Sequence, residues 1–549
     1  MCLLRWLADF PSIFSDRKVR FFDPHERYFR SGNSYISSRT WNLDRHAEDV
    51  IRLEDQFAPF AQPLFDINEN ILHGTQRFEG TLFRFPLRAE NTLSKLCETT
   101  YDVEKVHQLF ASLQIDAHML LLFLNHITTI EFYEKTSDAE HPIKTATIRL
   151  ATSVEQMVTS KRAEFLQEIK RWCDSGSERK PVSMSYPLTT ELLQEGHSTV
   201  QEWVISQQYG CEDDGEMSAF SDDLRRLPWV AVAVPFDSPS SSSAAWLEKP
   251  TGHVFCFLPL PLGVESPTGL RVHVHGYFAV DSNRRHLKER TGEQLEEKIA
   301  DRDLLWNEFL VSRLLPLALV NLAEYVAETS GAVGDPVVKR DAIFSTIPQL
   351  DEVKGQWRPL ATAFLEELPR LPVFYSPVDG GRFVPSSEAL FDDIEDKMSI
   401  TELIRRLLQQ NGTTLVSAPA FVLKQLGPAA VRVTASVVCT ALRNTEGSLS
   451  LTVEDRTTLL KYLTKSLEDK TEIVGTRLLA LADGSWIEFT HSSADGQILI
   501  DSEDHPRSVL PGLDHLFVRE DVVDICREIL SATDNGRLLH VVHNNVCIV

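Results

Sequence analysis

The segment Phe78–Arg88, with the sequence FEGTLFRFPLR, constrains the fold more than any other stretch of the chain. Successive side chains of a strand point to opposite faces of a sheet, and this segment separates its residues accordingly. Gly80, near its start, permits a close approach of another backbone. One face takes Phe83, Phe85 and Leu87, and the other takes Leu82, Arg84, Pro86 and Arg88. The pattern predicts a half-buried strand, so the first part of the chain must contain a sheet.

Further strands and helices alternate along the chain. Ser153 begins a long helix, because Gln156 completes a capping box and apolar residues follow at helical spacing. Asp303 caps a second long helix, which we expect to bend at Pro316. A shorter helix is predicted at Asp116–Leu124, with its first residue as the N-cap. Strands are predicted at Thr129–Tyr133, Thr145–Leu150, Trp229–Phe236, Val254–Leu260 and Leu270–Val280.

A chain of 549 residues is too long for one hydrophobic core, so several domains are expected. The predicted fold class is α+β and multi-domain, divided into residues 1–150, 151–330 and 331–549. The last part contains Asp379-Gly380 and Asp483-Gly484, each between apolar runs. Asp-Gly in this setting is a strong hairpin signal, because both residues tolerate positive φ. Two such hairpins suggest a duplicated α/β unit, although a common turn that recurs by chance gives the same pattern.

The charge of the chain disfavours whole classes of partner. The formal net charge is −24, from 79 acidic and 55 basic residues, and such an excess repels phosphate backbones and anionic membranes. We therefore expect neither nucleic acid nor membrane as a partner, and no apolar run approaches the length of a membrane span. The eight cysteines are scattered without a CxxC pair, which argues against a disulfide framework and fits a reducing compartment. A cytoplasmic location is predicted.

Sequence motifs for catalysis are absent. The chain has no GxxxxGK[ST] phosphate loop, no HExxH, no GxSxG and no GxGxxG after a strand. His273 and His275 stand two residues apart on one strand face, which is a spacing that a metal pair can use. No carboxylate or cysteine lies close to them in the sequence, so core histidines are the favoured interpretation. We predict no catalytic residue and no metal site.

Several ordered segments together resemble the sacsin family, whose large repeats begin with an ATPase fold related to the heat-shock chaperones of the GHKL superfamily. The segments are Asp9–Ser15, Phe21–His25, Gln56–Phe60, Gly80–Arg88, Leu121–Glu134, Gly252–Arg285 and Leu305–Pro316. The resemblance is firm as far as Pro316, and the remainder is similar to the family's α/β tail mainly through the Asp-Gly hairpins. It implies an incomplete GHKL-type α/β sandwich over 1–150, a sacsin-like middle domain over 151–330 and an α/β tail over 331–549.

The resemblance leaves only remnants of a nucleotide pocket. The superfamily's catalytic Glu, metal-binding Asn, adenine-reading Asp and glycine-rich segments would lie before Met1, so we expect a gene model truncated at its N-terminus. Gly80 and Thr81 match a strand position beside the adenine. Arg284 and Arg285 match a spot where the second domain reaches a basic residue toward the γ-phosphate. One threonine cannot recognise adenine, bind magnesium and bind phosphate at once. Structural roles are therefore favoured for Gly80 with Thr81 and for Arg284 with Arg285. No cofactor is predicted, and ATP with magnesium is expected only if upstream motifs are restored.

The resemblance implies a chaperone or co-chaperone that binds client polypeptides and heat-shock chaperones without autonomous ATP turnover. Two alternatives stay open: a GHKL-type ATPase whose missing motifs lie upstream, and an interaction scaffold without chaperone activity. A sheet without its nucleotide lid leaves Phe83, Phe85 and Leu87 under-covered, and contiguous apolar surface of that kind marks protein-binding sites. We therefore expect clients to bind at this strand.

Overall fold

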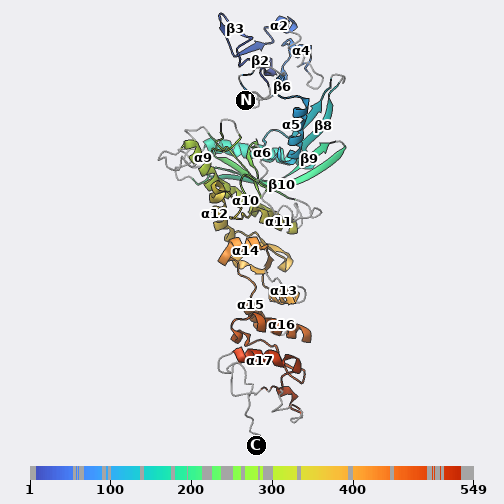
Figure 1. The fold of residues 1–549 in the computed structure, drawn as a ribbon, viewed down its shortest axis with the longest axis vertical. Coiled ribbons are helices and arrows are strands. Elements are labelled where there is room, and N and C mark those ends of the chain that lie inside the picture. Colours follow the sequence, from blue (N-terminus) through green and yellow to red (C-terminus); the bar gives the residue numbers. More distant parts are fainter. Residues whose placement is uncertain are drawn as a thin grey trace. The chain divides into compact units, whose positions relative to one another are not determined.

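The chain is a mixed α+β, multi-domain protein, as the sequence predicts (Figure 1). Its Cα positions separate into two compact units, one of Met1–Ala318 with Lys354–Trp357 and one of Leu319–Val353 with Arg358–Val549. The computed structural model describes residues 8–52, 57, 60, 67–88, 94, 96, 100–136, 141–174, 180–194, 196–212, 226–236, 251–260, 266–281, 285–288, 301–329, 336–392, 400–444, 451–490, 498, 500, 507 and 512–532.

The first sheet of unit 1 has four antiparallel strands and contains the predicted strand. Its order is β5 (Ser38–Asn42), β2 (Lys18–Phe22), β1 (Ser12–Asp16) and β6 (Phe78–Arg84). The strand β6 lies at one edge, paired with β1 so that Phe14 faces Leu82 and Ile13 faces Phe83. The prediction extended the strand to Arg88, but regular pairing ends at Arg84. Pro86 has no N–H to donate, which is why pairing does not continue through it.

One face of this sheet carries an aromatic core. Phe14, Phe21 and Trp41 are buried on it, and Phe57 and Phe60 cover them. The inward positions recur at every second residue of β1, β2 and β6, because successive side chains of a strand alternate between faces. The short elements that accompany the sheet are α2 (Ala47–Arg52), α4 (Glu69–Leu72), β3 (Arg30–Ser31) and β4 (Ser34–Tyr35).

The second sheet of unit 1 has eight strands. All neighbouring strands are antiparallel except β12 and β14, which run parallel. The strands β9 and β10 form a long hairpin closed at Gly196, whose φ of 79° a glycine adopts without strain. In spatial order the strands are β13 (Leu258–Pro259), β12 (Val254–Cys256), β14 (His273–Gly276), β11 (Trp229–Pro235), β10 (His197–Tyr209), β9 (Val182–Gln194), β8 (Ile143–Leu150) and β7 (Thr129–Glu134).

The predicted boundary at residue 150 falls inside this second sheet. The strands β7 and β8 precede that residue, yet β8 pairs with β9 over Ala146–Leu150. The predicted helix Asp116–Leu124 is also wrong. The helix α5 (Val103–Ile115) ends just before it, and Ala117–Met119 forms only a 3-10 turn whose following leucines are buried. The chain therefore leaves the first sheet after β6 and enters the second sheet at β7, before the predicted boundary at residue 150.

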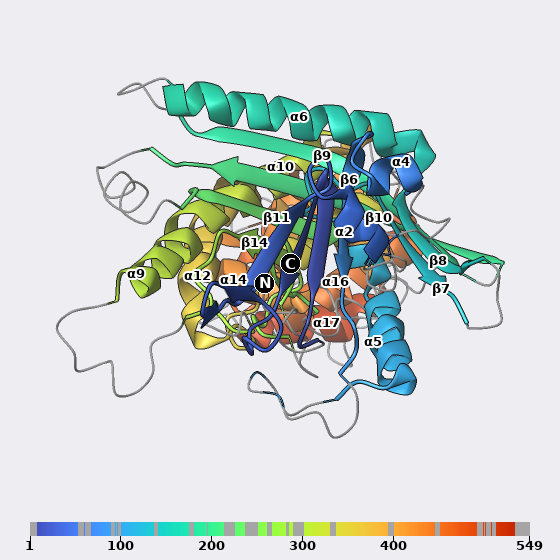
Figure 2. The same cartoon turned by 90° about the horizontal axis from the view of Figure 1, so that it is seen from above.

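The long helix α6 (Thr152–Asp174) packs along the strands of the eight-stranded sheet (Figures 1 and 2). Val158, Phe165 and Ile169 face the sheet at helical spacing, as the apolar stripe predicts, but the helix begins at Thr152, so Ser153 lies inside it and is not the N-cap. Arg162 is also on this buried face and is only 2% exposed. Its guanidinium donates to the carbonyl oxygens of Leu121 (2.8 Å) and Leu122 (3.3 Å). No carboxylate pairs with it among the described residues.

A second long helical run comprises α9 (Arg302–Phe309), a π-helical turn (Leu310–Leu314) and α10 (Leu315–Glu328). The π-helical turn directly precedes Pro316, the residue at which the sequence predicts a bend. The sequence showed no membrane span, but this run is long and apolar enough for one by length and composition. Of its most apolar window, 61% is buried within the protein, as in the core helix of a soluble domain.

The remaining elements form the second unit around a core of α13, α15, α16 and α17. Leu407, Val438, Leu460 and Ile529 are fully buried there, one from each helix. The strands β17 (Leu390–Asp392) and β18 (Leu415–Ser417) pair in parallel. The helices are α11 (Pro336–Thr346), α12 (Arg358–Glu367), α13 (Ile400–Gln410), α14 (Ala420–Leu426), α15 (Ala435–Asn444), α16 (Val453–Ser466) and α17 (Val523–Ala532).

The two Asp-Gly dipeptides lie in turns of different kinds. Asp379-Gly380 belongs to a 3-10 turn between β15 (Phe374–Ser376) and β16 (Arg382–Val384). Asp483-Gly484 lies between β19 (Leu479–Ala480) and β20 (Trp486–Ile487), where the Asp483 carboxylate accepts from the Ser485 amide at 2.9 Å. Each flanking pair of strands is antiparallel, but the connections are longer than the two Asp-Gly residues, and the predicted Asp-Gly hairpins are not confirmed. A 3-10 turn at the first site gives the proposed duplication no support.

We expect Arg162→Ala to lower the free energy of unfolding by about 3 kcal/mol. The substitution leaves two buried carbonyl oxygens without donors, at about 1–3 kcal/mol for each unsatisfied group. Lys161→Ala on the same helix removes only an exposed pair with Glu164 and should change stability by less than about 1 kcal/mol. Urea unfolding followed by tryptophan fluorescence measures both variants. Equal unfolding midpoints for the two would contradict the role given to Arg162.

Candidate binding site

Gly80 and Thr81 lie together at the start of β6, beside the end of β1. The hydroxyl oxygens of Thr81 and Ser15 are 3.0 Å apart, and Ser15 donates to the Gly80 carbonyl oxygen at 2.9 Å. Arg77 Nε donates to Asp16 at 2.8 Å, and this hydrogen bond lowers the pKa of the Asp16 carboxyl. These groups surround a hollow of about 440 Å³ and bond to one another. Thr81 therefore already has a partner in the protein.

Gly80 has a packing role that explains its identity. A Cβ at this position would lie 2.8 Å from Cζ of Phe78, closer than real Cβ contacts come. The Phe78 ring is held there by stacking on Phe14, with ring centroids 5.2 Å apart. Glycine at this position thus makes room for the ring that seals the core of the first sheet. A role for Gly80 and Thr81 toward a nucleotide remains a prediction.

Arg285 lies in the loop that follows β14. Its backbone amide donates to the Asp281 carboxylate at 2.8 Å, which is the main cause of the lowered pKa of Asp281. Val280 and Leu287 pair across the base of this loop. Arg284, the other predicted phosphate sensor, lies outside the described residues. The described geometry gives Arg285 a place in a closed surface loop, and its predicted role toward phosphate stays a prediction.

The outward face of β6 and the residues after it carry an exposed apolar strip of Phe83, Phe85 and Leu87, called here the β6 strip. Phe83 is 51% exposed and Leu87 43% exposed, while Phe85 is half-buried. The rings of Phe83 and Phe85 lie parallel, with centroids 6.4 Å apart. No strand pairs with the other side of β6 in the part of the chain that the structure describes. The strip therefore offers apolar side chains beside a free strand edge.

The inward face of the same segment borders an aromatic hollow that the sequence did not reveal. The hollow has a volume of about 610 Å³. Its rings pack edge-on and tilted against one another, with Phe10 and Tyr28 centroids 5.2 Å apart and Phe21 and Trp41 centroids 5.5 Å apart. The residues that line this aromatic hollow are Phe10, Phe21, Tyr28, Phe29, Arg39, Trp41, Phe57, Arg84 and Pro86.

Two arginines of the aromatic hollow have no acidic partner. Arg84 makes no ion pair or hydrogen bond with any described residue, and its partial burial lowers the pKa of its guanidinium. Arg39 lies over the Trp41 ring, 4.9 Å from its centroid, and likewise has no carboxylate beside it in the described structure. The cation–π contact with Trp41 compensates the charge of Arg39 only in part. The hollow therefore combines apolar walls with uncompensated positive charge.

Asp9 holds the two ends of this region together. Its Oδ1 accepts from Arg88 Nε at 3.0 Å and from Ser94 Oγ at 2.7 Å, and His25 Nε2 lies 3.3 Å away. Burial raises the pKa of the Asp9 carboxyl, but the hydrogen bonds and the positive charge of Arg88 together lower it. Asp9 and His25 belong to segments on which the family resemblance rests. Their shared role is to fasten the start of β1 to the residues that follow β6.

The paired histidines of β14 are core residues. His273 and His275 are both buried, and each Nδ1 accepts a backbone amide, from His253 at 3.1 Å and from Phe257 at 3.2 Å. Burial lowers the pKa of each to about 3, so both are neutral at physiological pH. No group of three or more His, Cys, Asp or Glu side chains among the described residues could hold a metal ion.

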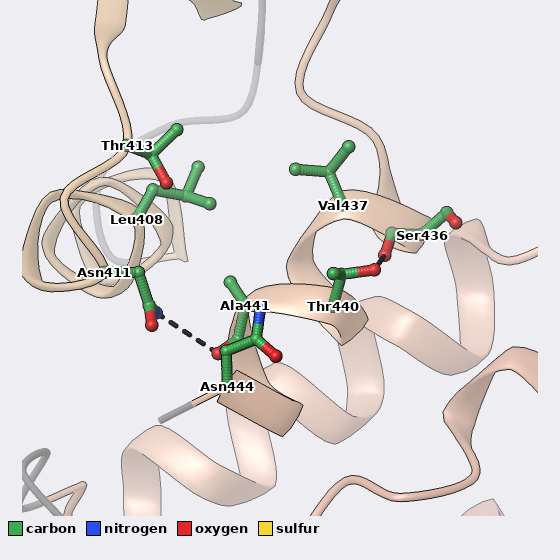
Figure 3. A pocket seen from close by; sticks show the side chains of 8 residues that line it. All are labelled: Leu408, Asn411, Thr413, Ser436, Val437, Thr440, Ala441 and Asn444. Carbon is green, nitrogen blue, oxygen red and sulfur yellow. Dashed lines mark hydrogen bonds between the residues drawn. The ribbon is translucent and has the colours of Figure 1, made fainter. Parts of the chain in front are cut away.

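A smaller hollow in unit 2 is a packing seam (Figure 3). It lies between α13, the turn after it, and α15, with a volume of about 280 Å³. Asn411 Nδ2 donates to the carbonyl oxygens of Leu407 (3.0 Å) and Ala441 (3.2 Å), and Thr440 donates to Ser436 (3.0 Å). The Asn411 side chain joins the end of α13 to α15, and the Thr440 hydroxyl bonds within α15, so the aromatic hollow and the β6 strip remain the stronger candidates.

Comparison with known proteins places these features in a family. A family model described as a sacsin domain matches residues 4–147, a range that contains the four-stranded sheet, the β6 strip and the aromatic hollow. The chain thus carries a sacsin domain. It is also 28% identical to human sacsin over 541 residues, which is 94% of this chain and 11% of the relative's length. Both comparisons support a relationship to the sacsin family, most directly for residues 4–147.

We expect unit 1 to lose stability as the pH falls from 7 to 5. His273 and His275 are neutral when folded, but in the unfolded chain they take up protons below pH 6.5. Unfolding therefore binds protons and becomes more favourable in acid, by up to about 1.4 kcal/mol per pH unit for each histidine. Chemical unfolding at several pH values should show a shallower slope for the double variant His273→Gln, His275→Gln. A slope in the double variant as steep as that of the wild type would contradict the prediction.

Proposed function

We propose that the chain acts as a sacsin-like chaperone or co-chaperone module that binds polypeptide clients and heat-shock chaperones without turning over ATP. The observation that carries this proposal is the β6 strip. Phe83 and Leu87 remain exposed beside a free strand edge, and apolar side chains presented in this way favour contact with other polypeptides. The net charge of −24 favours solubility of a molecule that exposes such a surface.

The proposal includes a fold relationship and a location. We interpret the four-stranded sheet as part of a GHKL-type sandwich, on the strength of Gly80-Thr81 and the ordered segments around it. We place the protein in the cytoplasm, because its eight cysteines are scattered without a CxxC pair, which fits a reducing compartment. The chain matches only 11% of the length of human sacsin, so activities of the whole relative are not assumed for it.

Client binding is tested by light scattering of a heat-denatured model enzyme mixed with the full chain. We expect the wild type to suppress aggregation without ATP at equimolar concentration. The double variant Phe83→Ser, Phe85→Ser should need at least tenfold more protein, because tenfold corresponds to only about 1.4 kcal/mol and burying one phenyl ring contributes about 1.5–3 kcal/mol. Val103→Ser with Ile115→Ser removes two exposed apolar residues of α5 instead and should behave as wild type. Failure of the folded wild type to suppress aggregation would favour a scaffold without chaperone activity.

Nucleotide binding is tested by calorimetric titration of the full chain with magnesium-ATP. We expect no saturable binding, because Thr81 already bonds to Ser15 and the adjoining Asp16 and Arg77 neutralise each other. Saturable micromolar binding that Thr81→Ala abolishes would show instead that this end of β6 is a working nucleotide site.

A further inference from the structure

The two unpaired arginines of the aromatic hollow lie at the ends of one row of residues across the first sheet. Arg39 of β5 is paired with Phe21 of β2, which is paired with Ser12 of β1, which is paired with Arg84 of β6. Directly paired residues share a face of the sheet, so all four belong to the inward face. Three strand spacings of about 4.8 Å separate the end residues, or roughly 14 Å between their backbones.

The middle of this row is apolar and aromatic. Phe21 is buried between the rings of Phe10, 5.6 Å away, and Trp41, 5.5 Å away. Tyr28 closes one side of the hollow and is 68% exposed, so its ring is accessible from solvent. Ser12 is fully buried, and its hydroxyl has no hydrogen-bond partner in the described structure. The row therefore has an arginine at each end, with the Phe21 ring and the Ser12 hydroxyl between them.

A partly buried arginine without an anion is unfavourable, because its charge has lost hydration and no protein group compensates that loss. This applies to Arg84, which has neither ion pair nor hydrogen bond among described residues, whereas Arg39 is exposed and has the Trp41 ring beside it. A ligand that brings carboxylates to both ends of the row would supply the missing partners. Guanidinium groups bind carboxylates by paired, charge-assisted hydrogen bonds.

An extended peptide fits this spacing. Its residues rise about 3.3 Å each, so side chains at positions 1 and 5 are about 13 Å apart, and positions 1, 3 and 5 lie on one face. We propose that the aromatic hollow binds an extended polypeptide segment with acidic residues at positions 1 and 5 and an aromatic residue at position 3. The acidic side chains pair with Arg39 and Arg84, and the aromatic ring packs on the floor between them. This assignment rests on the proposed function, because it takes the ligand to be polypeptide.

The test is calorimetric titration of the full chain with acetyl-Asp-Ser-Phe-Ser-Asp-amide at 0.15 M salt, where long-range repulsion from the net charge of the chain is screened beyond about 8 Å. We expect saturable binding with one site per chain. Replacing both aspartates of the peptide by asparagine, or its phenylalanine by alanine, should weaken binding about tenfold or more. No saturable binding to the wild type, or equal affinity for the aspartate and asparagine peptides, would overturn the proposal.

Variants of the chain locate the site. Arg84→Gln and Arg39→Gln should each weaken binding about tenfold, because each removes one charge-assisted pair. Arg20→Gln is the matched control, since Arg20 lies on the outward face of the same sheet and donates to Ser38. Thermal unfolding midpoints equal to wild type confirm that the variants fold. Binding unaffected by both hollow variants would place the peptide elsewhere and overturn the proposal.

This experiment separates the aromatic hollow from the β6 strip. Aggregation suppression that persists while the acidic peptide fails to bind would contradict the aromatic hollow and leave the proposed function standing. Peptide binding that persists in a chain unable to suppress aggregation would contradict the chaperone function and leave the aromatic hollow as a peptide site.

Discussion

The buried guanidinium of Arg162 connects the main layers of the eight-stranded sheet. It reaches from α6 to the carbonyl oxygens of the turn after α5, and its Nε lies 3.5 Å from the Tyr186 hydroxyl on β9. That hydroxyl accepts from Gln207 of β10 at 2.9 Å, and Trp229 of β11 donates to Gln207 at 3.1 Å. One helix and three adjacent strands are therefore tied by a single buried polar chain. Such networks fix one arrangement of a core, because an alternative packing would leave several buried groups unpaired.

The segment Phe78–Arg88 gives the first sheet two chemically different faces. Outward residues form the β6 strip, which is apolar and unspecific in what it can contact. Inward residues contribute Arg84 and Pro86 to the aromatic hollow, where charge and ring geometry select among ligands. Alternation along a single strand is enough to produce both surfaces. The same strand thus contributes to an exposed apolar surface and to a charged aromatic hollow, separated by the thickness of the sheet.

The features predicted correctly are those set by local periodicity. Alternation gives the strand at Phe78–Arg84, and the apolar stripe gives α6. The hairpin of β9 and β10 was missed because Ser206, Gln207 and Gln208 are buried in it, so apolar residues do not mark its core positions. The helix α5 was missed although Val103, Val106, Phe110 and Leu113 recur at helical spacing, and none of its residues is buried in the structure.

The aromatic hollow could not be predicted from periodicity at all. Its lining runs from Phe10 to Pro86, and those residues meet only because β5, β2, β1 and β6 pair in that order. The same holds for Asp9 and Arg88, whose ion pair joins positions far apart in the chain. The abundance of phenylalanine and arginine between Phe10 and Pro86 was visible in the sequence. What was missing was the register that sets Arg39 and Arg84 at the two ends of one row.

The proline that follows β6 limits what the free strand edge can recruit. An unpaired edge invites the edges of other chains, and long flat edges start fibrils. Here regular pairing covers seven residues, Phe78–Arg84, and Pro86 supplies no amide for a further rung. A segment that adds to this edge can therefore pair only alongside the seven residues of β6, so the proline sets the length of any contact made there.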